Sequence, residues 1–85
     1  MSAPKYQFNV RWKEELVCSC PEGALVLDFT MGVPTVYFPS EEIWQQRAPA
    51  WAKDKRVEIL DELTEWCRSE KVPLIVDDTG SVGEP

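Results

Sequence analysis

Hydrophobic and polar side chains alternate strictly near the beginning of the chain, over residues 5–13. The apolar members are Tyr6, Phe8, Val10 and Trp12, and the polar members are Lys5, Gln7, Asn9, Arg11 and Lys13. Because successive side chains of a strand point to opposite faces of a sheet, this pattern predicts a strand with one buried and one wet face. The wet face carries three basic residues.

Three further strands are predicted before the first helix. They span residues 16–20, 24–31 and 35–38. Proline and glycine stand together at 21–23 and again at 32–34, where they favour turns because proline fixes φ and glycine permits positive φ. Residues 24–31 are apolar on both faces apart from Asp28, which favours a central strand.

A switch to helix is predicted at Ser40. This residue is a good N-cap, and Glu41 and Glu42 place negative charge where the dipole of a first turn favours it. Pro49 disfavours helical geometry at the residue before it, so a short helix is expected near 41–47.

A longer helix is predicted from about Pro49 or Ala50 to about Lys71, because Pro73 cannot continue it. One arc of this helix is apolar and would face the core. Its members are Ala52, Ile59, Leu60, Leu63, Trp66 and Cys67, with Val57 at the edge. The opposite side carries an acidic stripe made of Asp54, Glu58, Asp61 and Glu65.

The order of elements predicts an α+β fold of two layers. We expect an antiparallel sheet of four to five strands in the order strand, strand, strand, strand, helix, strand, with the main helix packed on it. The last strand is residues 73–78, and the long helix could return it parallel to an earlier strand. Residues 1–78 form the predicted single domain, and 79–85 a disordered tail.

Composition excludes several function classes. The 85 residues include 15 acidic and 9 basic side chains and no histidine, for a net charge of −6. Nucleic-acid binding needs a basic patch, so we expect no direct nucleic-acid partner. No run approaches the roughly 20 apolar residues of a membrane-spanning helix, and the first residues do not resemble a signal peptide, so we expect no membrane partner and a cytoplasmic location.

The three cysteines are the first candidate for chemistry. Cys18, Cys20 and Cys67 could hold zinc or form a redox pair, but structural zinc ordinarily takes four cysteine or histidine ligands. Free cysteine is also among the most buried residue types. We therefore interpret these side chains as core residues and predict neither a metal nor a cofactor.

Asp28, Asp77 and Asp78 are the second candidate, since carboxylates at strand ends can gather a magnesium ion or act as an acid and base. The sequence has no glycine-rich phosphate loop and no histidine to activate a serine. We therefore expect that the protein is not an enzyme.

The acidic stripe of the long helix is the third candidate. Like charges four residues apart destabilise a helix, and a surface selected for stability alone would mix signs more evenly. The stripe is therefore either a solvated face that keeps the protein soluble or a recognition surface for a basic partner. Residues 1–40 carry a net charge of −1 and residues 41–85 a net charge of −5. The negative charge thus gathers in the helical half.

Trp44 and Trp51 flank the Pro49 corner. Trp51 either packs under the short helix or stands exposed as an aromatic anchor beside the acidic stripe. The leading hypothesis is a small non-enzymatic interaction protein of inhibitor, immunity-type or regulatory role, binding a basic protein partner. The predicted binding residues are Asp54, Glu58, Asp61, Glu62, Glu65 and Trp51. A homo-oligomeric structural module and a small metal- or thiol-dependent enzyme stay open as alternatives.

Overall fold

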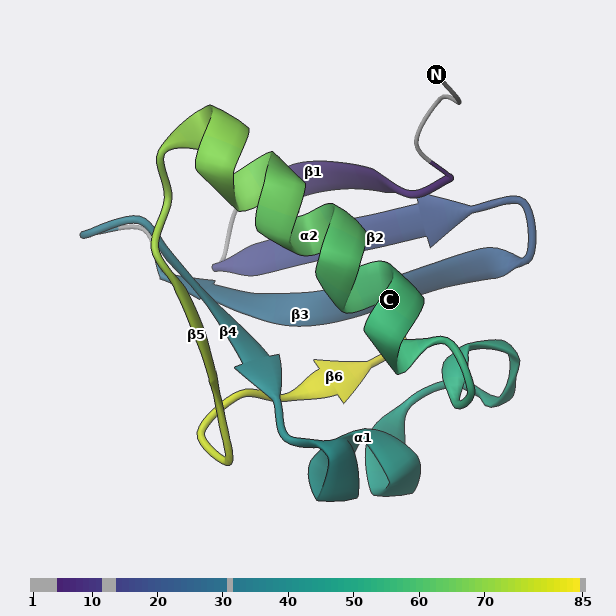
Figure 1. Ribbon diagram of the computed structural model, residues 1–85. Coiled ribbons are helices and arrows are strands. Elements are labelled where there is room, and N and C mark those ends of the chain that lie inside the picture. Colours follow the sequence, from purple (N-terminus) through teal and green to yellow (C-terminus); the bar gives the residue numbers. More distant parts are fainter. Residues whose placement is uncertain (1–4, 12–13, 31, 85) are drawn as a thin grey trace.

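In the residues that the structure describes, six strands build one sheet, whose main path runs in the order β1-β2-β3-β4-β5 (Figure 1). Their bounds are β1 (Gln7–Arg11), β2 (Glu15–Cys20), β3 (Gly23–Thr30), β4 (Thr35–Pro39), β5 (Leu74–Asp77) and β6 (Val82–Gly83). The computed structural model describes residues 5–11, 14–30 and 32–84. Trp12, Lys13 and Met31, which the sequence assigns to strands, lie outside the described residues.

Strands β1 to β4 form an antiparallel meander, whereas β5 pairs with β4 in parallel. A parallel partner needs a crossover connection, and the helical segment between β4 and β5 provides it. The predicted α+β class is confirmed. The sheet is larger than the four to five strands expected, and the parallel strand makes it mixed instead of purely antiparallel.

Two helices and a short 3-10 turn connect β4 to β5. They are α1 (Glu41–Arg47), η1 (Ala50–Ala52) and α2 (Arg56–Glu70). Ser40 caps α1 as predicted, because its Oγ accepts a hydrogen bond from the Ile43 backbone N–H at 3.4 Å. The long helix begins at Arg56, later than predicted, since the chain after Pro49 first forms η1. It ends at Glu70, because the next residue, Lys71, adopts a left-handed φ of 59° that a helix cannot continue.

The core lies between the sheet and α2, which crosses one face (Figure 1). Alternate residues of β3, namely Leu25, Leu27 and Phe29, are buried with Ile59 and Leu63 of α2. Val57, expected at the edge of the core arc, is instead 68% exposed. Helix α2 therefore buries a narrower arc than its hydrophobic pattern suggests.

Trp44 of α1 is completely buried at the lower end of this core. Its ring stacks on Phe38 with 5.1 Å between centroids, and its Nε1 donates a hydrogen bond to the Ala52 carbonyl at 2.9 Å. These contacts fasten α1 and η1 to the end of β4, as a buried tryptophan can when its N–H has a partner.

Asp28 lies on the sheet face opposite the core, which explains a carboxylate in an otherwise apolar strand. It stands between Glu15 of β2 and Tyr37 of β4 in the register and accepts a hydrogen bond from Ser81 Oγ at 2.9 Å. The side chain is half-buried and has a polar partner.

The segment expected to be a disordered tail is folded over its described part, residues 79–84. Strand β6 pairs antiparallel with β3 beside Val26 and Leu27, and Val82 is 4% exposed. Burial of Val82 and the hydrogen bond from Ser81 to Asp28 stabilise this segment. The prediction of disorder over 79–85 is therefore wrong for these residues, because it relied on local polarity and could not include these long-range contacts.

Candidate functional site

Four carboxylates predicted to bind a partner lie on the solvent side of α2 and of the turn before it. We call Asp54, Glu58, Asp61 and Glu65 the α2 acidic face; all four are exposed. The spacing of Glu58, Asp61 and Glu65 by three and four residues places them along one side of a helix of 3.6 residues per turn. Asp54 lies in the turn that precedes the helix. The side opposite to them holds the buried residues of α2.

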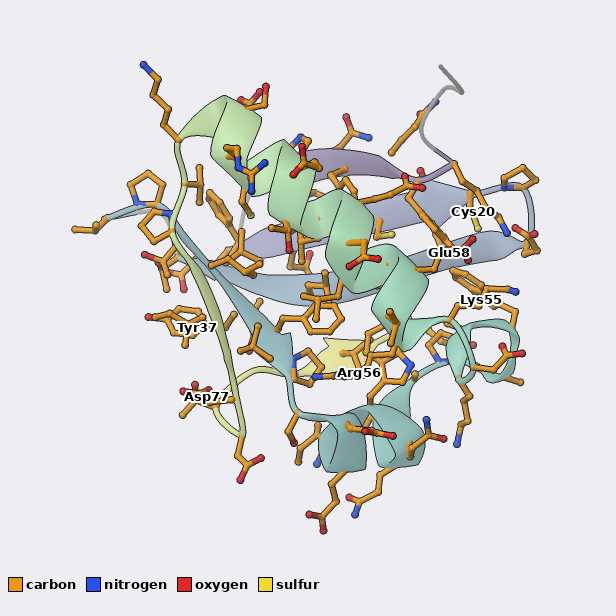
Figure 2. All side chains as sticks on the ribbon, viewed as in Figure 1. Cys20, Tyr37, Lys55, Arg56, Glu58 and Asp77 are labelled. Atoms are coloured by element: carbon orange, nitrogen blue, oxygen red, sulfur yellow. The ribbon has the colours of Figure 1, made fainter. Side chains whose placement is uncertain are left out.

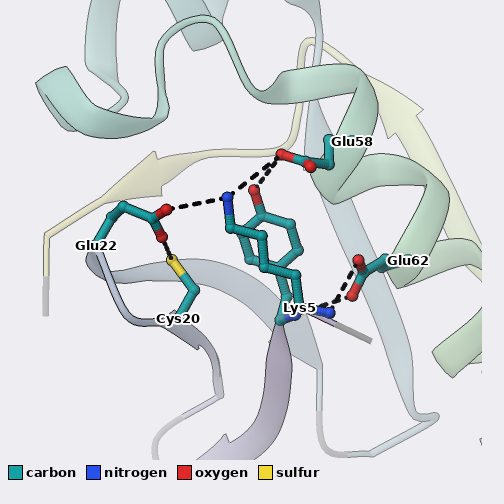
Figure 3. A network of polar contacts seen from close by, with 6 residues as sticks. Lys5, Cys20, Glu22, Glu58 and Glu62 are labelled. Atoms are coloured by element: carbon teal, nitrogen blue, oxygen red, sulfur yellow. Dashed lines mark hydrogen bonds and ion pairs between the residues drawn. The ribbon is translucent and has the colours of Figure 1, made fainter. Parts of the chain in front are cut away.

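Glu62, the fifth predicted carboxylate, is half-buried and contacts the beginning of the chain (Figure 3). Its two carboxylate oxygens accept hydrogen bonds from the backbone N–H groups of Tyr6 at 2.9 Å and Lys5 at 3.1 Å. Since both backbone donors precede β1, Glu62 fastens the entry of the first strand to α2. This contact gives Glu62 a structural role.

Glu58 is shared between the α2 acidic face and the same N-terminal segment (Figure 3). It accepts a hydrogen bond from the Tyr6 hydroxyl at 2.6 Å, and the Lys5 ammonium lies 4.0 Å away. Burial of the ring is the main cause that raises the pKa of the Tyr6 hydroxyl above its ordinary value, and the hydrogen bond to Glu58 is the second cause. Tyr6 therefore stays a neutral donor to Glu58.

The Lys5 ammonium also pairs with Glu22 at 3.0 Å, on the turn between β2 and β3. The hydrogen bond from the Cys20 thiol at 3.0 Å and the contact with Lys5 lower the pKa of the Glu22 carboxyl to about 2. Sequence reasoning placed Lys5 on a wet strand face and gave Glu22 no role, because these residues are far apart along the chain and no local pattern links them.

The other carboxylates of the α2 acidic face have few hydrogen bonds or ion pairs that would offset their negative charge. In the described ranges, Asp54 and Asp61 take part in no hydrogen bond or ion pair. Glu65 pairs with Arg68 at 2.6 Å, as the sequence suggested, but both side chains are about 70% exposed. An exposed pair of this kind is weak because water and salt screen it.

Two basic side chains near the beginning of α2 donate hydrogen bonds to backbone carbonyls of the protein itself. The Arg56 guanidinium donates to the Pro39 carbonyl at 3.0 Å and lies over the Phe38 ring, and Figure 2 shows it between α2 and the end of β4. The Lys53 ammonium donates to the Gln45 carbonyl at 2.6 Å. Lys55 is half-buried and forms no ion pair with Glu58 in the described part of the chain.

Val57 is the apolar group of this surface. At 68% exposure it is a large hydrophobic side chain in contact with water, three residues from Asp54 and four from Asp61. Val57 and Asp61 are neighbours because residues four apart lie side by side on a helix surface. Asp54 precedes the helix, and it borders the same shallow hollow as Val57. An exposed valine beside two carboxylates was not anticipated, because the sequence pattern placed Val57 at the edge of the buried arc.

Trp51 does not stand exposed as an aromatic anchor, which was one of the two positions that the sequence left open. It is half-buried in η1 and packs against the core and the turn between β2 and β3. A Cβ added at Gly23 would lie only 2.7 Å from the Trp51 Nε1 atom. Packing accounts for this tryptophan, and Val57 is the apolar side chain that the α2 acidic face presents.

The cysteines are free thiols. Cys18 and Cys67 are buried, and burial raises their pKa values to about 12 and about 11. Cys20 is half-buried beside Glu22. Its burial is the main cause that raises the pKa of its thiol, and the hydrogen bond that the thiol donates to Glu22 is the second cause. In the chain as described, no three cysteine, histidine or carboxylate side chains are grouped as metal ligands would be.

Asp28, Asp77 and Asp78 do not meet in one cavity. Asp28 borders a hollow of about 550 Å³ on the open face of the sheet, together with Glu14, Thr30, Tyr37 and Thr79. Asp77 instead accepts hydrogen bonds from the Thr79 hydroxyl and from its backbone N–H, and these lower the pKa of the Asp77 carboxyl. This pattern is that of a turn after β5.

Comparison with protein-family models, with curated proteins and with solved structures finds no match for this chain. Within the described residues, no helix has the length and apolar character needed to span a membrane. Any assignment of function therefore depends on the geometry of the chain itself.

Proposed function

We propose that this chain is a small non-enzymatic binding protein whose α2 acidic face docks a basic protein partner. The observation that carries the proposal is the set of exposed carboxylates around Val57, next to which the basic side chains of Lys53 and Arg56 contact backbone carbonyls of the protein itself.

Like charges on one surface lower the stability of the helix, and the exposed ion pair of Glu65 with Arg68 offsets this only weakly. Asp61 and Glu65 are like charges four residues apart, which destabilises a helix by a few tenths of a kcal/mol, about 0.2–0.5. A basic partner recovers this energy and is also attracted from a distance, because complementary fields raise the association rate. A surface of this kind favours a partner with clustered lysine and arginine side chains.

The partner also needs an apolar group opposite Val57. Interfaces are commonly built as an apolar centre with a polar rim, and the centre contributes most of the affinity because water is excluded there. Asp54, Glu58 and Asp61 supply the acidic rim around the valine. We expect a basic segment in which an aliphatic or aromatic side chain lies between the cations.

A titration with a defined probe tests this proposal. The probe is a short synthetic peptide rich in lysine that also carries leucine, added to isotope-labelled protein while amide resonances are followed. We expect shifts to concentrate over residues 54–65 and to weaken as salt increases, because salt screens exposed charges within about 10 Å at 0.1 M.

Two variants of equal net charge separate a local site from overall charge. Asp54→Lys with Asp61→Lys changes the face, and Glu14→Lys with Glu84→Lys changes two exposed carboxylates elsewhere. The first pair should weaken binding about tenfold or more, the equivalent of at least 1.4 kcal/mol, and the second about twofold at most. Equal weakening by both pairs would refute a site on α2.

A further inference from the structure

Strand β5 is an edge of the sheet with exposed apolar side chains. In the part of the chain that the structure describes, β4 is its only strand neighbour. Ile75 is 37% and Val76 45% exposed, on opposite faces of the strand. Natural edge strands are usually protected by charges, prolines or bulges, because unpaired backbone groups attract another strand. Between Leu74 and Val76, β5 has none of these.

The hydrogen-bonding pattern shows which backbone groups of β5 point outward. The Val36 N–H donates to the Pro73 carbonyl at 2.9 Å, so Pro73 faces β4. Since backbone groups alternate sides along a strand, Ile75 faces β4 as well, whereas the N–H and C=O groups of Leu74 and Val76 point away from the sheet. These two residues offer two donors and two acceptors to another strand.

Charge distribution selects the direction of that strand. Lys71 precedes β5, and Asp77 and Asp78 end it and follow it; all three are exposed. A second β5 running antiparallel brings the basic end of one copy toward the acidic end of the other, twice by symmetry. A parallel second copy would bring the acidic ends together, and like charges side by side are destabilising.

We infer that two copies of this chain pair antiparallel through β5 and extend the sheet across a two-fold axis. In this register Leu74 lies opposite Val76 of the second copy, which allows four backbone hydrogen bonds. Ile75 lies opposite its own equivalent at the axis, and the two isoleucines cover each other on the open face of the sheet. The inference is independent of the function proposed for α2.

The opposite edge of the sheet is unsuited to the same pairing. Strand β1 exposes three polar side chains and one valine, namely Gln7, Asn9, Arg11 and Val10, and Lys5 lies just before it. In an antiparallel β1 pair that sets Gln7 against Asn9, Lys5 of each copy would lie opposite Arg11 of the other. Lys5 pairs with Glu22 and Arg11 with Glu15 in each copy, but these exposed ion pairs leave the two cations facing each other across the β1 pair. This arrangement disfavours self-pairing at β1, so we expect the assembly to stop at two copies and not continue as a filament.

Sedimentation or light scattering over about 10 μM to about 1 mM tests the dimer, since a strand-edge interface is small and binds weakly. The mass should rise from 9.7 kDa toward twice that value. Val76→Lys should keep the protein monomeric over the whole range, whereas Val33→Lys, at an exposed turn residue, should leave the dimer intact. A wild-type monomer at every concentration, or larger species, would overturn the inference.

A cross-link tests the register even where Val76→Lys impairs folding. Residues at a non-hydrogen-bonded antiparallel pair have Cα atoms about 4.5 Å apart, which a disulfide spans. In a Cys20→Ser background, Ile75→Cys should oxidise to a covalent dimer that reductant separates, and Val33→Cys should not. Equal cross-linking of both variants, or cross-linking of neither, would contradict pairing through β5.

Discussion

At the scale of single residues, Gly80 is where the last segment of the chain meets β4. A Cβ at this position would lie 2.6 Å from the Phe38 carbonyl carbon and 2.8 Å from its oxygen. These neighbours are backbone atoms within the sheet and cannot rotate aside. Gly80 therefore allows the turn after β5 to approach the sheet closely enough for β6 to pair with β3.

Gly80→Ala should lower the free energy of unfolding by about 1–3 kcal/mol, because the added methyl group forces the backbone apart. Gly83→Ala is the matched control, since a Cβ at Gly83 meets nothing within 4 Å. Urea denaturation measures both. Equal stability of the two variants would mean that the C-terminal segment is not packed on β4.

Thiol reactivity is a second prediction at this scale. The thiolate is the reactive form, and burial raises the pKa of Cys18 to about 12 and that of Cys67 to about 11. Ellman's reagent near pH 8, about the ordinary thiol pKa, should label Cys20 slowly in the folded protein and leave the other two unlabelled.

All three cysteines should react at once after unfolding in guanidinium, which provides the control for the total count. Labelling of the native protein should become faster as pH rises, since more thiolate forms. Rapid reaction of three thiols in the folded state would contradict the burial of Cys18 and Cys67.

At the scale of elements, Glu62 and Glu65 have different roles although they are one turn apart on α2. Glu62 holds two backbone N–H groups before β1, whereas Glu65 forms one exposed ion pair. Glu62→Ala should destabilise the protein by about 1–3 kcal/mol, because two partly buried N–H groups lose a charged acceptor. Glu65→Ala should change stability by less than about 0.5 kcal/mol.

Chemical denaturation of these two variants measures the difference, and hydrogen exchange of the Lys5 and Tyr6 amides locates it. Faster exchange should be confined to Glu62→Ala if this side chain docks β1 onto α2. The same loss of stability in both variants would show that the helix surface, and not the strand contact, determines the effect.

Glu22, in the turn between β2 and β3, should make the stability of the folded protein depend on pH. The folded pKa of Glu22, about 2, lies below its ordinary value of 4.5. A lowered folded pKa means that the contribution is complete above the ordinary pKa and is lost as pH falls from about 4.5 toward about 2. The stability of the wild type should therefore fall more steeply in this window than that of Glu22→Gln.

Stability measured from about pH 6 to about pH 2 tests this, with Glu84→Gln as the control at an exposed carboxylate near the chain end. The control should follow the wild type. Parallel curves for the wild type and Glu22→Gln would show that Lys5 and Cys20 do not stabilise the ionised form of Glu22.

Local pattern predicted the elements that depend on neighbouring residues. The strand around Phe8, the Ser40 cap and the end of α2 before Pro73 followed from sequence, because each depends on contacts within a few residues. The alternation was wrong for Val10, which is 44% exposed although the pattern placed it on the buried face. The late beginning of α2 did not, since η1 depends on Trp44 reaching the Ala52 carbonyl. Strand β6 did not either, because its stability comes from β3.

The candidate site was predicted in part for the same reason. The carboxylates of α2 share one side because helical spacing determines it. Glu62 was assigned to partner binding although it contacts Lys5 and Tyr6, more than 50 residues away. Val57 was placed at the edge of the core arc, and its 68% exposure did not follow from the wheel, because a wheel gives direction but does not show where the covering sheet ends.

At the scale of the whole molecule, the α2 acidic face and the edge strand β5 lie on different surfaces. The α2 acidic face lies on the solvent side of the helix layer, and β5 lies at the edge of the sheet (Figure 1). Pairing through β5 would carry two copies of the acidic face on one extended sheet. A basic partner with two binding segments could then bind both copies, and its apparent affinity would increase.

Affinity capture with three immobilised proteins tests the central claim most directly. These are the wild type, Asp54→Lys with Asp61→Lys, and the charge-matched Glu14→Lys with Glu84→Lys, each confirmed as folded and exposed to extract of the source cells at about 0.15 M salt. The account predicts a basic protein retained by the wild type and the charge-matched control but not by the α2 variant. Identical sets of retained proteins on all three would contradict it.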